Sequence, residues 1–162
     1  MASIYLPPWR IDVSSRPGVV SPVPLRTLAR LAARALDTAG APSPGSLALI
    51  LTDDAELATL NEQHMGHAGP TDVLSFPMLT AGFALPPGRR PHLGDIVISV
   101  ERAVQQAADG RGGQTSDVQW SATDELRLLV VHGVLHVCGM DHAEPQDNAV
   151  MRALEKRILA EQ

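Results

Sequence analysis

The chain has 162 residues and a formal net charge of -5, and its length fits a single domain. Hydrophobic residues make up 44% of it but aromatic residues only 3%, so the core must be built from Leu, Val, Ile and Ala. No apolar run approaches the roughly 20 residues of a membrane helix, and the single Cys138 excludes an internal disulfide. We therefore expect a soluble cytoplasmic protein, whose acidic balance argues mildly against a nucleic-acid partner.

Short apolar runs alternate with helical patterns, and glycine and proline mark their boundaries. In chain order, we expect a strand over residues 4–13, a helix over 24–38, a strand over 46–52, a helix over 53–66, strands over 71–77 and 95–100, and helices over 100–109, 121–138 and 145–159. Pro7 and Pro8 would confine the first strand to a sheet edge, because proline donates no backbone hydrogen bond. About four strands are too few for a barrel, so the pattern predicts an α+β fold with helices packed on one mixed sheet.

Helix-start signals precede two of these helices. Asp53 is followed three residues later by Glu56, and Ser121 by Asp124, spacings that are typical of N-terminal caps. The last helix has a regular apolar stripe and nothing that suggests chemistry. Its stripe consists of Val150, Met151, Leu154, Ile158 and Leu159.

The stretch 132–142 contains three histidines at the spacing of a metal site. His132 and His136 are four residues apart, so they share a helix face and lie about 6 Å apart along its axis. Gly139 allows the chain to leave the helix and to bring His142 back toward them. Three nitrogen ligands favour zinc with a fourth position open to water, which is typical of catalytic sites. The alternative is three packed or solvated histidines without a metal.

The spacing H-x-x-x-H-x-x-G-x-x-H also occurs in metzincin proteases. Those enzymes carry a glutamate directly after the first histidine as general base, whereas this chain has Gly133 there. Peptide hydrolysis by that mechanism is therefore not expected, because glycine has no side chain to move a proton.

The run from His132 to His142 resembles the signature of the YbeY family of bacterial metal-dependent endoribonucleases. Two upstream stretches agree with it: Leu60-Asn61 followed by residues 70–77 (PTDVLSFP), and residues 93–99 (LGDIVIS). Their order and separations also match, so the resemblance extends over about residues 45–160. It implies the same α+β fold and a zinc-dependent endoribonuclease that acts on single-stranded RNA.

The resemblance also implies a role in small-subunit ribosomal RNA maturation and ribosome quality control. The expected partners are this RNA, the small ribosomal subunit and its assembly factors, with no membrane. Zinc would polarise a phosphoryl oxygen, activate a water, or both, and attack by the 2′-hydroxyl of the RNA itself is the alternative mechanism.

With no carboxylate inside the metal motif, proton transfer has to come from another side chain. The catalytic candidates are Asp95 and Asp141, and Asp72 and Glu125 are further carboxylates near the motifs. Asp141 is favoured as the acceptor that orients an imidazole. Asp95 either caps a turn or points into the cleft.

One departure from the family concerns RNA contacts. An aromatic residue and then an arginine usually follow the Leu-Asn pair in the YbeY family, and this arginine is thought to contact RNA. This chain has His64 and Met65 there. Arg89, Arg90 and Arg102 are therefore the candidates for RNA binding.

The remaining histidines and the cysteine are given structural interpretations. His64, His67 and His92 are expected to be solvated loop residues, because two ligands without a third do not make a site. Cys138 is expected to be a buried thiol on the far side of the helix from the imidazoles.

Two further functions would use the same site. A ribosome-assembly or ribosome-binding protein would need the metal mainly to hold its fold, and Met65 and the acidic balance favour this alternative. A hydrolase of a small ester or peptide would differ only in the cleft. An open fourth coordination position favours the nuclease.

Overall fold

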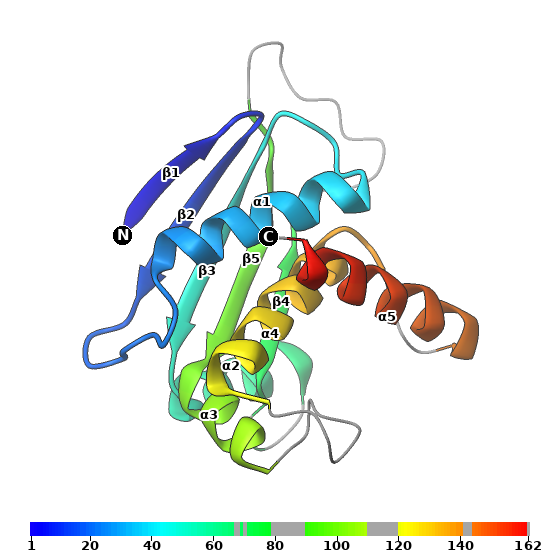
Figure 1. Ribbon diagram of the computed structural model, residues 1–162. Coiled ribbons are helices and arrows are strands. Elements are labelled where there is room, and N and C mark those ends of the chain that lie inside the picture. The colour runs from blue at the N-terminus through cyan, green and yellow to red at the C-terminus, as the bar shows by residue number, and fades with distance from the viewer. Residues whose placement is uncertain (67–68, 70, 79–89, 110–119, 141–143, 162) are drawn as a thin grey trace.

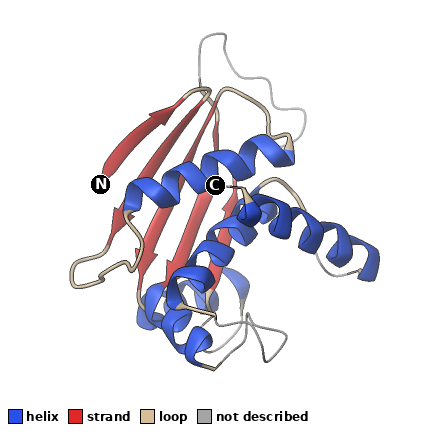
Figure 2. Ribbon diagram, in the orientation of Figure 1, coloured by secondary structure: helices blue, strands red, loops and turns tan. Residues whose placement is uncertain are grey.

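The computed structural model describes residues 1–66, 69, 71–78, 90–109, 120–140 and 144–161. Figures 1 and 2 show the arrangement of its helices and strands. The elements within the described ranges are β1 (Ala2–Leu6), β2 (Trp9–Ser15), α1 (Leu25–Ala39), β3 (Gly45–Thr52), α2 (Asp54–Met65), β4 (Val73–Pro77), β5 (His92–Ser99), α3 (Val100–Ala108), α4 (Ala122–Val137) and α5 (Pro145–Ala160).

The strands form one mixed sheet in the order β1-β2-β3-β5-β4. The inner strands β2, β3 and β5 are parallel, and β1 and β4 run antiparallel at the two edges. The expected α+β class with helices on one mixed sheet is therefore confirmed. The single edge strand expected over residues 4–13 is wrong, because Pro7 and Pro8 form the turn of a hairpin and divide it into β1 and β2. The sheet in the described part of the chain thus has five strands rather than four.

The two faces of the sheet carry different helices, since successive side chains of a strand point to opposite sides. Helices α1 and α4 lie on one face of the sheet (Figure 2). They cover fully buried side chains such as Ile11, Leu49 and Ile96. On the other face, Leu57 of α2 packs with Leu74 and Val97. The main core therefore lies between the sheet and the α1–α4 layer.

Helix α4 begins and ends at the residues that the sequence indicates. The Ser121 hydroxyl accepts a hydrogen bond from the Asp124 N–H at 3.1 Å, and the Asp124 carboxylate accepts one from the Ser121 N–H at 2.9 Å. At the other end, Gly139 adopts a φ of 92° and donates to the His136 carbonyl at 2.9 Å, while Met140 donates to Leu135 at 3.0 Å. This pair of bonds is a Schellman motif, which stops the helix and turns the chain.

Helix α5 packs against α4 and α1. Met151 and Ile158 are buried as expected, whereas Val150 is 54% exposed, so the stripe expected on this helix is only partly right. Within the described ranges, no helix combines the length and the apolar character needed to cross a lipid bilayer.

Candidate functional site

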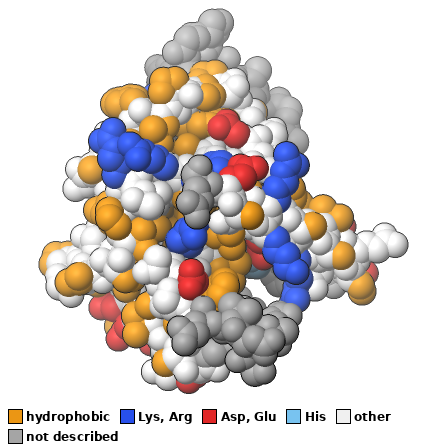
Figure 3. All heavy atoms as spheres, viewed as in Figure 1, with side chains coloured by type: hydrophobic (Ala, Val, Ile, Leu, Met, Phe, Trp, Pro, Cys, Tyr) orange, Lys and Arg blue, Asp and Glu red, His pale blue; other side chains and the backbone are white. Residues whose placement is uncertain are grey.

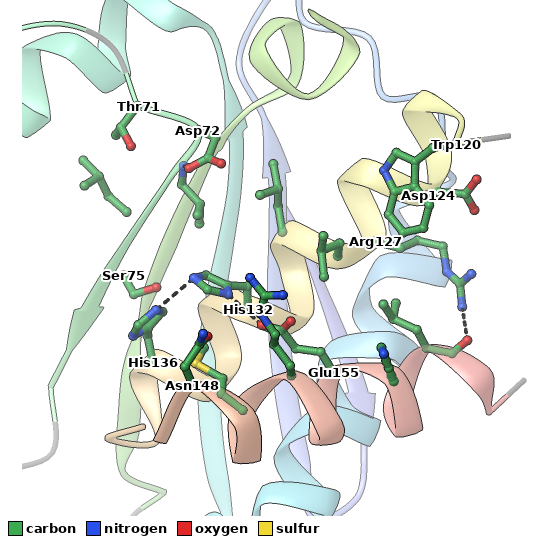
Figure 4. A pocket seen from close by; sticks show the side chains of 18 of the residues that line it. Thr71, Asp72, Ser75, Trp120, Asp124, Arg127, His132, His136, Asn148 and Glu155 are labelled. Atoms are coloured by element: carbon green, nitrogen blue, oxygen red, sulfur yellow. Dashed lines mark hydrogen bonds and ion pairs between the residues drawn. The ribbon is translucent and has the colours of Figure 1, made fainter. Parts of the chain in front are cut away.

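His132 and His136 lie on one face of α4 and turn their rings toward the same point (Figure 4). Their Nε2 atoms are 2.9 Å apart, and their ring centroids are 4.5 Å apart. Two nitrogens bound tetrahedrally to one zinc ion, each at 2.0–2.1 Å, would lie about 3.3 Å apart. The two imidazoles therefore need to move by only a few tenths of an ångström to share an ion.

The third expected ligand, His142, and the neighbouring Asp141 lie outside the described residues. The structure describes the turn that leads to them, in which Gly139 has the positive φ that the metal-site interpretation requires. Across the described ranges, no three His, Cys, Asp or Glu side chains gather closely enough to hold a metal ion. The described residues thus provide two of the three expected ligands.

Glu155 of α5 fixes the orientation of His132. Its Oε1 lies 2.7 Å from Nδ1 of the imidazole, so the carboxylate accepts a hydrogen bond from that ring N–H. In a neutral imidazole this leaves the lone pair on Nε2, the nitrogen that faces His136 (Figure 4). An outer carboxylate often holds a metal-binding imidazole in the right tautomer in this way.

The histidine pair opens onto a cleft of about 1240 Å³. Its walls come from the segment leading into β4, from one face of α4 and from α5 (Figure 4). Figure 3 shows Lys and Arg side chains along the rim of a hollow beside α5. A cleft of this size exceeds the usual pocket for a small molecule, about 300–1,000 Å³, and can accept a segment of a polymer.

Residues of the first upstream stretch hold this wall in place. Ser75 of β4 donates a hydrogen bond to the Gly133 carbonyl of α4 at 3.1 Å, which ties the strand to the helix beside the histidines. Asn61 is 8% exposed and donates to the Gly69 carbonyl at 3.1 Å, between α2 and β4. These motif residues therefore position the cleft instead of forming its chemistry.

Asp95 does not point into the cleft. Ile96 beside it faces Gly133 of α4, so the alternation of the strand places Asp95 on the opposite side of the sheet. There its carboxylate accepts a hydrogen bond from the His92 ring at 2.7 Å. This placement gives no support to a catalytic role for Asp95.

The described arginines expected to bind RNA also lie away from the cleft. Arg102 donates to the Asp54 carboxylate from Nη2 at 2.9 Å and from Nε at 3.3 Å, and so joins α3 to α2. Arg90 lies over the ring of Tyr5 on β1, with 5.8 Å between its Cζ and the ring centroid. Arg89 is outside the described residues. RNA binding by Arg90 or Arg102 at this cleft therefore has no structural support.

The other histidines take no part in the pair. His64 is exposed and packs edge-on against Phe76 at a centroid distance of 5.3 Å. His92 is not the solvated loop residue that was expected, because it lies in β5 and its Nδ1 is 2.9 Å from the Ser46 hydroxyl. His67 lies outside the described residues.

Cys138 follows α4 and is only partly buried. Its burial nevertheless raises the pKa of the thiol to about 11. The thiol is therefore protonated at neutral pH, a form that is neither a good metal ligand nor a nucleophile.

Several residues of the cleft were not anticipated from the sequence: Trp120, Arg127, Arg152, Glu155 and Lys156. The last helix, in which the sequence suggests no chemistry, contributes Glu155, whose carboxylate contacts His132. The sequence contains a signal that indicates the position of Glu155. Glu155 lies four residues after Met151 and three before Ile158, so it is a carboxylate on the inward stripe of an amphipathic helix.

Comparisons with known proteins agree on the family of this chain. The family model described as Endoribonuclease YbeY matches residues 20–162. A protein named Endoribonuclease YbeY from Symbiobacterium thermophilum is 45% identical over 135 residues, which cover 81% of this chain and 81% of the relative. Relatives of the same name from Mycolicibacterium gilvum and Thermobifida fusca are 42% identical over 160 residues and 41% identical over 155 residues. Each alignment covers 93% of this chain, with 82% of the first relative and 92% of the second.

A solved structure shares the fold. The solution structure of TM1509 from Thermotoga maritima superposes with a TM-score of 0.55 at 23% identity, covering 91% of this chain and 85% of that one. By their names, the relatives above are enzymes of the endoribonuclease class. This chain belongs to the YbeY family, which confirms the resemblance inferred from its three motifs.

Proposed function

We propose that this protein is a zinc-dependent endoribonuclease in which His132, His136 and His142 hold one zinc ion. The observation that carries the proposal is the 2.9 Å separation of the first two Nε2 atoms at the wall of a large cleft. An all-nitrogen donor set suits zinc better than magnesium or calcium, which prefer oxygen ligands. The names of the relatives support RNA as the substrate.

The proposed substrate is single-stranded RNA in small-subunit ribosomal RNA maturation and ribosome quality control in the cytoplasm. The small ribosomal subunit and its assembly factors are the proposed partners. The resemblance of the three motifs to the YbeY family supports this role.

The residues around the histidine pair indicate the role of each group in the reaction. When bound, zinc supplies a Lewis acid for a phosphoryl oxygen and lowers the pKa of water. Gly133 offers no general base beside the ligands, and we assign to Asp141 the role of orienting an imidazole. Product ends separate the two mechanisms, because a 2′,3′-cyclic phosphate would identify the 2′-hydroxyl of the RNA as the nucleophile of the first step.

Metal removal tests the proposal directly. The purified protein is expected to contain one zinc ion per chain by elemental analysis and to cleave a single-stranded RNA. Dialysis against a chelator should abolish cleavage, because the remaining groups provide no comparable electrophile, and added zinc should restore it. Cleavage at the original rate by protein shown to be metal-free would contradict the proposal.

The Glu155→Gln variant tests whether Glu155 orients His132 for zinc binding. We expect the dissociation constant for zinc to rise about 10- to 100-fold, because the neutral amide orients His132 less firmly and makes its Nε2 less basic. The measurement is competition with a chromophoric chelator. The matched control is Glu161→Gln at the end of the same helix, where the carboxylate is 3.8 Å from Arg157 and far less enclosed. Equal zinc affinity in both variants would show that Glu155 has no such role.

A further inference from the structure

Two cations of α5 line the cleft beside the histidine pair. Arg152 and Lys156, the single lysine of the chain, are exposed and lie four residues apart on one face of the helix. They are therefore about 6 Å apart along its axis, a spacing comparable with that of successive phosphates on one strand. Among the described residues, neither is in an ion pair or a side-chain hydrogen bond.

Carboxylates on the cleft wall are already bound to protein groups. Asp72 accepts a hydrogen bond from the Val73 N–H, Asp124 accepts hydrogen bonds from the N–H and the hydroxyl of Ser121, and Glu155 accepts one from His132. The part of α5 that lines the cleft carries two cations and one carboxylate, Glu155, so it is a local positive surface on a chain whose net charge is -5.

Trp120 adds an aromatic surface to the same cleft. It precedes the first turn of α4 and is half-buried, and its Nε1–H donates a hydrogen bond at 2.7 Å to the fully buried Glu125. This bond restrains the orientation of the indole ring. Figure 4 shows Trp120 at the α4 start of the cleft, at a distance from the histidine pair.

We propose that Arg152, Lys156 and Trp120 form the binding surface for a single strand of RNA, with phosphates on the two cations and a base stacked on the indole. This inference rests on the proposed nuclease function and names the residues that hold its substrate. A basic groove combined with a stacking aromatic side chain is the arrangement that binds single-stranded nucleic acids without sequence preference. A strand held in this way passes His132 and His136, which lie on the same cleft.

The test compares variants of equal charge. The double variant Arg152→Gln/Lys156→Gln is compared with Arg26→Gln/Arg157→Gln, which removes two exposed cations that do not line the cleft. Fluorescence anisotropy of a short labelled single-stranded RNA, with EDTA present to prevent cleavage, gives the dissociation constant over a series of salt concentrations. Cleavage by the zinc-loaded proteins gives kcat and KM separately.

For the cleft variant we expect the dissociation constant to rise by about tenfold or more for each lost cation. The slope of log affinity against log salt should fall by about 1.4, or 0.7 for each phosphate contact, while the control changes little. Equal losses in the two double variants would overturn the proposal. Because binding is measured without cleavage, this result is distinct from a failure of the nuclease assignment.

Trp120 is tested separately. Trp120→Ala should weaken single-strand binding by about 5- to 150-fold, and Trp120→Phe, which keeps an aromatic face but loses the hydrogen bond to Glu125, should bind more tightly than Trp120→Ala. Far-UV circular dichroism verifies that both variants fold. If the two variants lose the same affinity, or if a blunt RNA duplex binds as tightly as the single strand, the stacking surface is excluded.

Discussion

Substitution of His136 with alanine is expected to abolish RNA cleavage while the protein stays folded. The proposed zinc site would lose one of its three ligands, and with it several kcal/mol of transition-state stabilisation. Since about 1.4 kcal/mol corresponds to a factor of ten, the rate should fall by about a thousandfold or more. The side chain is only half-buried, so the substitution should change the free energy of unfolding of the metal-free protein by about 1 kcal/mol or less.

The measurements are cleavage of a defined single-stranded RNA, zinc content and melting temperature. His92→Ala is the control, because this histidine is 39% exposed and bonds to Asp95 on the opposite face of the sheet. It should keep both zinc and activity. Loss of the fold together with activity in His136→Ala would instead favour the alternative of a ribosome-assembly protein whose metal is structural.

Gly133→Glu is expected to prevent stable folding. A Cβ at this position would lie 2.6 Å from Cγ2 of Ile96 in β5, and that atom is on the stiff β-branched part of the side chain. The new carboxylate would also be buried without a partner. Together the two effects should destabilise the protein by about 4 kcal/mol or more, a large part of the 5–15 kcal/mol that stabilises a typical domain.

Gly133→Ala separates the effect of the steric clash with Ile96 from the effect of the buried charge. Alanine improves helix propensity by about 1 kcal/mol, but the overpacking is larger, so we expect a net loss of about 1–2 kcal/mol and a melting temperature lower by about 2–8 °C. Adding Ile96→Ala removes the clashing atoms. The double variant should therefore lose less stability than the two single variants lose together. Strict additivity, measured by urea unfolding, would show that the contact with Ile96 is unimportant.

Close packing of α4 on β5 also explains the departure from the metzincin pattern. The position that carries the general base in those proteases faces the core in this chain, where Gly133 is buried against Ile96. A glutamate could not reach the open cleft from there. The missing base therefore follows from the architecture of the fold.

The helices could be predicted well because their signals are local. Ser121 with Asp124, and Gly139, mark the ends of α4 by hydrogen bonds to groups a few residues away. The β1–β2 hairpin was missed because Pro7 and Pro8 are compatible both with an edge strand and with a turn. The pairing of β2 with β3, a strand distant in sequence, decides between an edge strand and a turn at this point.

The candidate site could be predicted only where one helix provides it. His132 and His136 share a face by their spacing alone, and the structure brings them together. Glu155 and Lys156 reach the cleft only because α5 packs beside α4, a contact that no local pattern specifies. Asp95 was placed in the cleft as one of two options because the sequence does not reveal which side of β5 faces α4.

In the proposed zinc site, the hydrogen bond between Glu155 and His132 would link α5 to the metal ion. If His132 binds zinc as proposed, docking of residues 145–160 and affinity for the ion share one imidazole and should be reciprocally coupled. Loading should slow backbone amide exchange along this helix. Conversely, displacement of this helix should weaken zinc binding.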